Sequence, residues 1–158
     1  MGKLAVLAIG GNSLIKDEQH QGIEDQYKAV CETVVHIADI IADGHDVIIT
    51  HGNGPQVGFI LRRSEIAQEA ADLHYVPLVN CVADTQGSIG YQIQQVLNNE
   101  FRRRGIEKLV VTMVTQVVVD KNDLAFQNPT KPIGSFYSKD EVTQIKDQNP
   151  EWILVEDA

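Results

Sequence analysis

Two glycine-rich segments, each directly after a short apolar run, constrain the fold of this chain most strongly. The first, Gly10–Asn12, follows Leu4–Ile9, and the second, Gly52–Gly54, follows Asp46–Thr50. Both apolar runs predict buried parallel strands, and each loop precedes a segment with helical periodicity. Glycine lets the backbone approach a ligand and direct its N–H groups at it, and a nearby helix start adds partial positive charge. The pair of loops therefore predicts a site for an anion, a phosphate or a carboxylate-like group.

Apolar periodicity predicts the elements between and after these loops. Spacings of three and four predict a helix over Ile23–Ala42, a second beginning at Pro55 and a third over about Ala83–Arg104. The apolar runs Leu109–Met113 and Gln116–Val119 predict a third and a fourth strand. Strands that alternate with helices indicate an α/β fold, an open, mostly parallel sheet with helices on both faces. Ligands of such sheets bind at the carboxyl ends of the strands, where both glycine loops lie.

The sequence changes character after Asp120. Residues 122–137 hold two prolines, a glycine and several polar residues, with little periodicity, so they predict an excursion from the sheet. Ser138–Glu141 is a capping-box pattern that predicts the start of a short helix, and Trp152–Val155 predicts a strand. The expected organisation is an α/β domain over residues 1–120 and an incomplete second unit over residues 121–158.

Composition excludes several classes of function. The 158 residues suffice for one domain with a real core, and the net charge of −9 disfavours binding to nucleic acid or to an anionic membrane. No apolar stretch approaches the ~20 residues of a membrane span, and the first residues do not have the layout of a signal peptide. Cys31 and Cys81 have no metal-ligand spacing, so no metal site is expected. They are interpreted as buried reduced thiols, which fit a reducing cytoplasm.

Four polar groups are candidates for function, each with a structural alternative. Lys131, stiffened between two prolines, is suited to reach an anion, although a solvated loop lysine is the favoured interpretation from the residues alone. His51 is a possible ligand contact, although local bonding to the backbone is the favoured interpretation. Asp84-Thr85-Gln86-Gly87 lies at the expected start of the third helix, where either Asp84 is the N-cap or the segment has a substrate-side role. Arg102–Arg104 most simply complement the helix dipole.

Four motifs in this order resemble carbamate kinase, a member of the amino acid kinase superfamily. They are Ala8-Ile9-Gly10-Gly11-Asn12, Thr50-His51-Gly52-Asn53-Gly54-Pro55-Gln56-Val57-Gly58, Thr85-Gln86-Gly87 with Ile89-Gly90-Tyr91, and Pro129-Thr130-Lys131-Pro132-Ile133-Gly134 with Phe136-Tyr137. The last motif separates carbamate kinases from relatives such as acetylglutamate and aspartate kinases. Many of those relatives carry a lysine at the position of Ala8, a lysine that carbamate kinases lack.

The resemblance implies phosphoryl transfer between ATP and carbamate, which usually runs from carbamoyl phosphate and ADP toward ATP in arginine catabolism. It implies that the two glycine loops bind carbamate and the transferring phosphoryl group, and that Lys131 adds a mobile positive charge as the catalytic residue. The implied substrate-binding residues are Gly10, Gly11, Asn12, Gly52, Asn53 and Gly54. The resemblance further implies a cytoplasmic homodimer, with residues after Asp120 forming a protruding loop and hairpin subdomain.

The chain departs from this family in length. Members are roughly twice as long, as expected for ~300-residue α/β chains, and their second half supplies the adenine pocket and the groups around Mg²⁺ and the phosphates. We therefore expect the N-terminal half of a carbamate kinase, without the nucleotide-binding half and with no Mg²⁺, ATP or ADP bound directly by this chain. The alternatives are a catalytically inactive anion-binding fragment of the same fold and another member of the superfamily. The Pro-Thr-Lys-Pro-Ile-Gly run argues against the last.

Overall fold

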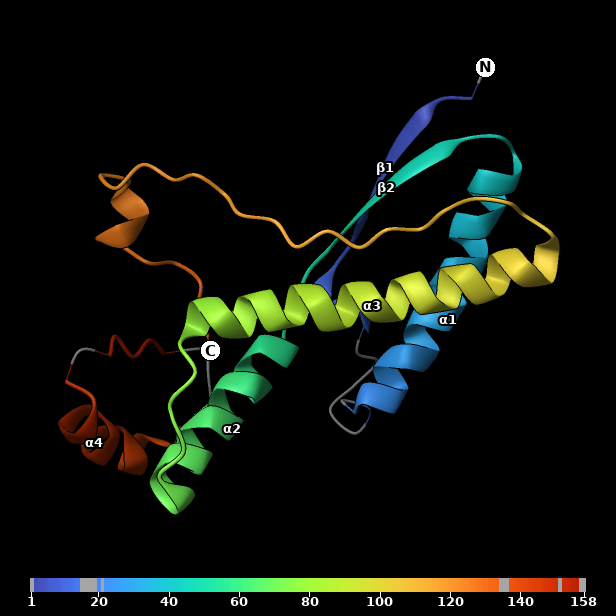
Figure 1. Cartoon of the computed structure of the whole chain (residues 1–158). Helices are drawn as coiled ribbons and strands as arrows, with labels where there is room; N and C mark the ends of the chain where they lie inside the picture. Colours follow the sequence, from blue (N-terminus) through green and yellow to red (C-terminus); the bar gives the residue numbers. More distant parts are fainter. Residues whose placement is uncertain (1, 15–19, 21, 134–136, 151, 157–158) are drawn as a thin grey trace.

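The described part of the chain consists of a small parallel sheet, four α-helices and two short 3-10 turns (Figure 1). The computed structural model describes residues 2–14, 20, 22–133, 137–150 and 152–156. In chain order the elements are β1 (Leu4–Ile9), η1 (Gly11–Leu14), α1 (Ile23–Ala42), β2 (Asp46–His51), α2 (Gln56–Ala71), α3 (Leu78–Arg104), η2 (Leu124–Phe126) and α4 (Lys139–Gln148). None of these helices has both the length and the apolar character that crossing a bilayer requires.

β1 and β2 pair in parallel, with α1 as the crossover between them. The register runs from Leu4 opposite Asp46 to Ile9 opposite His51, so both strands reach the same edge of the sheet at their carboxyl ends. The predicted bounds of α1 are confirmed, and the chain leaves it through Gly44, whose φ of 88° favours glycine. This unit, β1–α1–β2, confirms the predicted α/β class and the parallel sheet.

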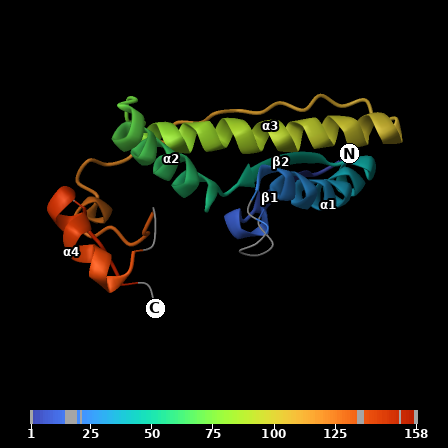
Figure 2. The same ribbon diagram turned by 90° about the horizontal axis from the view of Figure 1, so that it is seen from below.

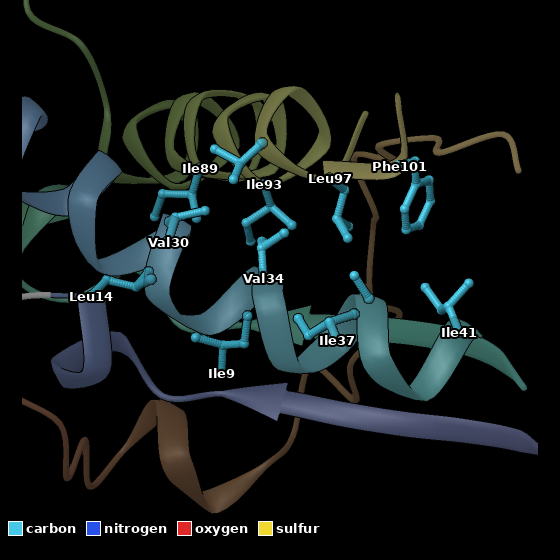
Figure 3. Packing of buried hydrophobic residues seen from close by; sticks show 12 residues of the cluster. Ile9, Leu14, Val30, Val34, Ile37, Ile41, Ile89, Ile93, Leu97 and Phe101 are labelled. Atoms are coloured by element: carbon cyan, nitrogen blue, oxygen red, sulfur yellow. The ribbon is translucent and has the colours of Figure 1, made fainter. Parts of the chain in front are cut away.

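The core lies between one face of the sheet and the facing stripes of α1 and α3 (Figure 3). Leu7, Val47 and Ile49 pack against it from the strands, because side chains of a strand alternate between its two faces. The alternate strand side chains Leu4, Val6 and Ile48 are exposed. The buried residues of the core are Ile9, Leu14, Val30, Val34, Ile37, Ala38, Ile41, Ile89, Ile93, Val96, Leu97 and Phe101.

α3 begins five residues earlier than the sequence pattern predicts, at Leu78 and not at Ala83. Cys81 explains the difference, because it is fully buried against Val57 and Leu61 of α2 and gives the first turn of α3 a packing partner. Asp84 therefore lies inside the helix, and its predicted N-cap role is wrong. Burial also raises the pKa of the Cys81 thiol, which keeps this thiol protonated and unreactive. Cys31, by contrast, is half-buried.

The predicted strands Leu109–Met113 and Gln116–Val119 are wrong: residues 109–119, hereafter the extended segment, run back along α3 without pairing to β2 (Figures 1 and 2). Side chains of α3 take the place of a neighbouring strand. Gln94 Nε2 donates to the Val110 carbonyl at 3.0 Å, and the Thr115 N–H donates to Gln86 Oε1 at 2.7 Å. An apolar run forms a strand only where a second backbone supplies a ladder of hydrogen bonds.

The last described part of the chain lies beside α2, away from the sheet (Figure 2). The predicted capping box is confirmed, since the Ser138 N–H and hydroxyl both contact Glu141 Oε2, at 2.8 and 2.7 Å. The strand predicted at Trp152–Val155 is wrong, because residues 152–155 have no strand partner within the described part of the chain. No hairpin forms there among the described residues.

Candidate functional site

The two glycine loops, residues 10–12 and 52–54, meet backbone to backbone at the carboxyl edge of the sheet. A Cβ atom on Gly52 would lie 2.6 Å from the Gly11 nitrogen, and one on Gly11 would lie 2.8 Å from the Gly54 nitrogen. Both distances are shorter than a side-chain carbon can approach a backbone atom. Glycine is therefore required at positions 11 and 52 by the contact of the loops itself. The parallel register of β1 and β2 brings the loops together, since both strands end at the same level.

The backbone bonds of the second loop restrict which of its N–H groups can reach a ligand. The Gly52 N–H donates to the Ile9 carbonyl at 2.8 Å and so continues the β1–β2 ladder by one rung. We expected all N–H groups of residues 52–54 to be available to a ligand, but the Gly52 N–H already has a backbone partner. Asn53 and Gly54 carry the next N–H groups along the chain. The Asn53 carbonyl accepts from the Val57 N–H at 3.1 Å, which joins the loop to the first turn of α2.

α2 begins directly after the second glycine loop, with Pro55 at its N-cap and Gln56 as its first residue. No acidic side chain lies in its first turn. The positive end of the helix dipole is therefore not neutralised locally, which favours an anion beside the loop. The expected start of this helix at Pro55 agrees with the structure to one residue.

Thr85 is a functional candidate that the sequence did not single out, although it lies within the segment Asp84–Gly87, for which a substrate-side role was one alternative. Its hydroxyl donates to the Val82 carbonyl at 2.6 Å and accepts from Asn53 Nδ2 at 3.2 Å. The residue is fully buried on α3. Its position four residues before Ile89, on the apolar stripe of the helix, was the available signal, because a buried hydroxyl on such a stripe needs hydrogen-bond partners.

His51 forms a local contact with the backbone, as the favoured interpretation expected. Its Nδ1 lies 3.1 Å from the Gly52 carbonyl oxygen, so this nitrogen carries the proton when the bond forms. The imidazole thereby stiffens the junction between β2 and the second loop.

Lys131 is exposed, and the structure gives it no hydrogen bond or ion pair within the described residues. The segment that carries it follows η2, which lies apart from the β1–β2 sheet in Figure 1. The structure brings the two glycine loops together, and no hydrogen bond or ion pair among the described residues joins Lys131 to them. Its role as the catalytic residue stays a prediction. Gly134 and Phe136 of the same motif lie outside the described residues.

The arginines at the end of α3 form ion pairs that connect α3 with α1. Arg103 and Arg104 both bond Glu100, and Arg104 also reaches Asp39 of α1 at 2.5 Å. The hydrogen bonds from Arg103 and Arg104 lower the pKa of Glu100 to about 2. This arrangement gives the arginine run a structural role in helix packing.

The part of the chain that the structure describes contains no group of three or more His, Cys, Asp or Glu side chains that could hold a metal ion. The chemistry of the described site is that of backbone N–H groups, a helix N-terminus and the side chain of Asn53.

Comparison with known proteins identifies the family. The model of the amino acid kinase family matches residues 3–149. The chain belongs to the amino acid kinase family. Among curated proteins, this amino acid kinase chain is 54% identical to the carbamate kinase-like protein YahI of Escherichia coli and 48% identical to the carbamate kinase of Pyrococcus furiosus. Both matches include the whole of this chain and 50% of the relative, so the chain spans about half the length of the curated relatives it matches.

Comparison with solved structures agrees with this assignment. The carbamate kinase of Giardia lamblia bound to AMP-PNP superposes with a TM-score of 0.86 at 39% identity, covering 99% of this chain and 49% of that one. A crystal structure from Aeropyrum pernix K1 gives a TM-score of 0.87 at 37% identity, covering 98% of this chain and 48% of that one. These matches confirm the resemblance to carbamate kinase and the α/β fold class.

Proposed function

We propose that this chain is the N-terminal, carbamate-binding half of a carbamate kinase, a phosphotransferase with a carboxy-group acceptor. The reaction is phosphoryl transfer between ATP and carbamate, running physiologically from carbamoyl phosphate and ADP toward ATP. The observation that carries the proposal is the backbone contact between the glycine loops at Gly11 and Gly52, in a chain 48% identical to a carbamate kinase. The proposal includes a cytoplasmic location, a homodimer and a place in arginine catabolism.

In this proposal the site acts by positioning and by electrostatics. The N–H groups of the loops and the N-terminus of α2 bind the oxygens of carbamoyl phosphate and stabilise the negative charge that develops during transfer. The ammonium group of Lys131 adds a positive charge when its segment closes over the loops. The complete enzyme uses ATP or ADP with Mg²⁺. We assign neither the nucleotide nor the metal to this chain, and no step here depends on them.

A catalytically inactive anion-binding fragment is the second candidate, and the half-length match to the relatives favours it for the chain by itself. Both candidate functions predict that the chain binds an anion, but only the first predicts catalytic turnover in a complete enzyme. We expect the isolated chain to bind carbamoyl phosphate, to bind ADP weakly if at all, and to form no ATP from the two.

Binding of carbamoyl phosphate to the isolated chain, followed by calorimetric titration, tests the proposal. Gly52→Ala places a methyl group 2.6 Å from the Gly11 nitrogen, so the loops must separate, and we expect affinity to fall by about tenfold or more, the cost of losing one or two aimed donors. Gly87→Ala is the matched control, because a Cβ atom there meets nothing within 4 Å. Equal affinity in the wild type and both variants, or no binding to the wild type, contradicts the proposed site.

A further inference from the structure

We infer that Thr85 fixes the side-chain amide of Asn53 with its carbonyl oxygen toward the ligand, so that the site selects a carbamoyl group over an acetyl group. The inference rests on the proposed function, because it takes the second glycine loop as the place where the ligand binds. It assigns Thr85 the role of a positioning residue, and it assigns Asn53 the recognition of an N–H donor on the ligand.

The hydrogen bonds around Thr85 determine which end of the amide faces it. A threonine hydroxyl has one proton, and at 2.6 Å from the Val82 carbonyl oxygen that proton is committed to the bond with Val82. The hydroxyl oxygen can then only accept a hydrogen bond. At 3.2 Å the group of Asn53 that faces it must therefore be the donor Nδ2. A flipped amide would set two acceptor oxygens against each other next to a buried hydroxyl.

The surroundings hold both residues in this arrangement. Thr85 is fully buried on α3, one helical turn before the core residue Ile89. Asn53 is held through its main chain as well, since its carbonyl accepts from the Val57 N–H of α2 at 3.1 Å. Asn53 is thus bonded to α3 through its side-chain amide and to α2 through its backbone carbonyl. Because Oδ1 and Nδ2 diverge from one carbon atom, the acceptor Oδ1 lies on the side of the amide away from Thr85.

This orientation has a consequence for ligand choice. Carbamoyl phosphate and acetyl phosphate present the same phosphate and the same acyl oxygen, so backbone N–H groups cannot tell them apart. They differ in one group, an NH₂ in the first and a CH₃ in the second. An oriented amide oxygen bonds the NH₂ and is left unpaired by the CH₃, and sites that hydrogen-bond a ligand group reject analogues that lack it. A freely rotating amide would not discriminate in this way.

The test compares the affinities of the 158-residue chain for the two acyl phosphates, followed by NMR on ¹⁵N-labelled protein. We expect the wild type to bind carbamoyl phosphate about tenfold more tightly than acetyl phosphate, the worth of one hydrogen bond at the upper end of its range. Thr85→Val removes the hydroxyl at constant shape and should bring the two affinities within threefold of each other, mainly by weakening the binding of carbamoyl phosphate. A threefold difference is roughly the lower end of the free-energy range of one hydrogen bond. Thr85→Ser keeps the hydroxyl and should keep the discrimination.

The outcomes separate this inference from the proposed function. Equal affinity of the wild type for both phosphates, or full discrimination retained by Thr85→Val, overturns the inference and leaves the anion site intact. Failure of the wild type to bind either compound overturns both. If Thr85→Val does not fold, Asn53→Ala is the test variant instead, because it should weaken the binding of carbamoyl phosphate more than the binding of acetyl phosphate. Equal weakening of the two by Asn53→Ala overturns the inference.

Discussion

The strands β1 and β2 and the extended segment 109–119 have similar apolar sequences and different structures. β1 and β2 pair residue by residue, and one face of each is packed under α1 and α3. The extended segment bonds to glutamine side chains of α3, and most of its apolar side chains face solvent, with Val117 80% and Val118 99% exposed. The comparison shows that an apolar composition allows a segment to form a strand, but the strand forms only where a neighbouring backbone pairs with it.

The largest difference between the two regions should be in how much a truncated side chain lowers the free energy of unfolding. Leu97→Ala removes a side chain that is 2% exposed, and we expect it to lower the free energy of unfolding by about 2–5 kcal/mol, the usual range for such a cavity. Val118→Ala, in the extended segment, should change it by less than about 0.5 kcal/mol. Urea unfolding followed by circular dichroism measures both. Similar losses in the two variants would mean that the extended segment belongs to the same packed unit.

The next largest effect concerns Lys131, in a complete enzyme that carries this half. If its ammonium group meets the transferring phosphoryl group, Lys131→Ala should lower the turnover number by roughly 10²-fold or more, as for removal of one preorganised charge. Lys131→Arg should restore it only in part, because guanidinium differs in shape and reach. Lys121→Ala, an exposed lysine of the same part of the chain, is the control. A near-wild-type rate for Lys131→Ala at saturating substrates would make this lysine structural.

Self-association should report on the unpaired surface. Exposed apolar groups and unpaired strand backbone favour pairing with another chain, so we expect a dimer or larger species in light scattering at tens of micromolar protein. Val117→Lys together with Val118→Lys should shift the population toward monomer. Leu124→Lys, 70% exposed but outside the extended segment, serves as the comparison. A wild-type chain that is cleanly monomeric contradicts this expectation.

The smallest expected effect is the pH dependence of stability at the junction of α1 and α3. The pKa of Glu100 is lowered from its ordinary 4.5 to about 2 by hydrogen bonds from Arg103 and Arg104. A lowered folded-state pKa contributes stability that is present above pH 4.5 and is lost as the pH falls toward 2. Glu100→Gln should therefore flatten the fall in melting temperature across this window. Glu107→Gln, at an exposed glutamate, should retain the wild-type slope.

Much of the fold from β1 to α3 could be predicted from the sequence, because the patterns that indicate these elements are local. α1 has an unbroken apolar stripe and a glycine at its end, and the bounds expected from the sequence, about Ile23 to Ala42, match the helix. The capping box at Ser138 is likewise local. The start of α3 was missed because Cys81 packs against α2, a contact that no local pattern encodes. The two later strands were missed because pairing depends on a partner backbone.

The kind of site could be predicted from the sequence, but only some of the residues that form it could. The glycines at 11 and 52 indicated close backbone approach, and the structure shows what they approach, which is each other. Thr85 was missed because its partner, Asn53, lies 32 residues away in sequence. The place of Lys131 relative to the loops depends on how residues after Asp120 fold, and sequence motifs carry no distance information.

The contact between the glycine loops couples ligand binding to the folding of the chain. Gly11 and Gly52 are 41 residues apart in sequence and meet only after β1 and β2 have paired around α1. The unfolded chain therefore contains no partial version of the site, and any anion held there binds the native state alone. Its free energy of binding adds to the stability of the sheet by mass action, about 2.7 kcal/mol at a hundred times the dissociation constant. The proposed ligand would thus stabilise the folded state of a chain whose described residues form a sheet of only two strands.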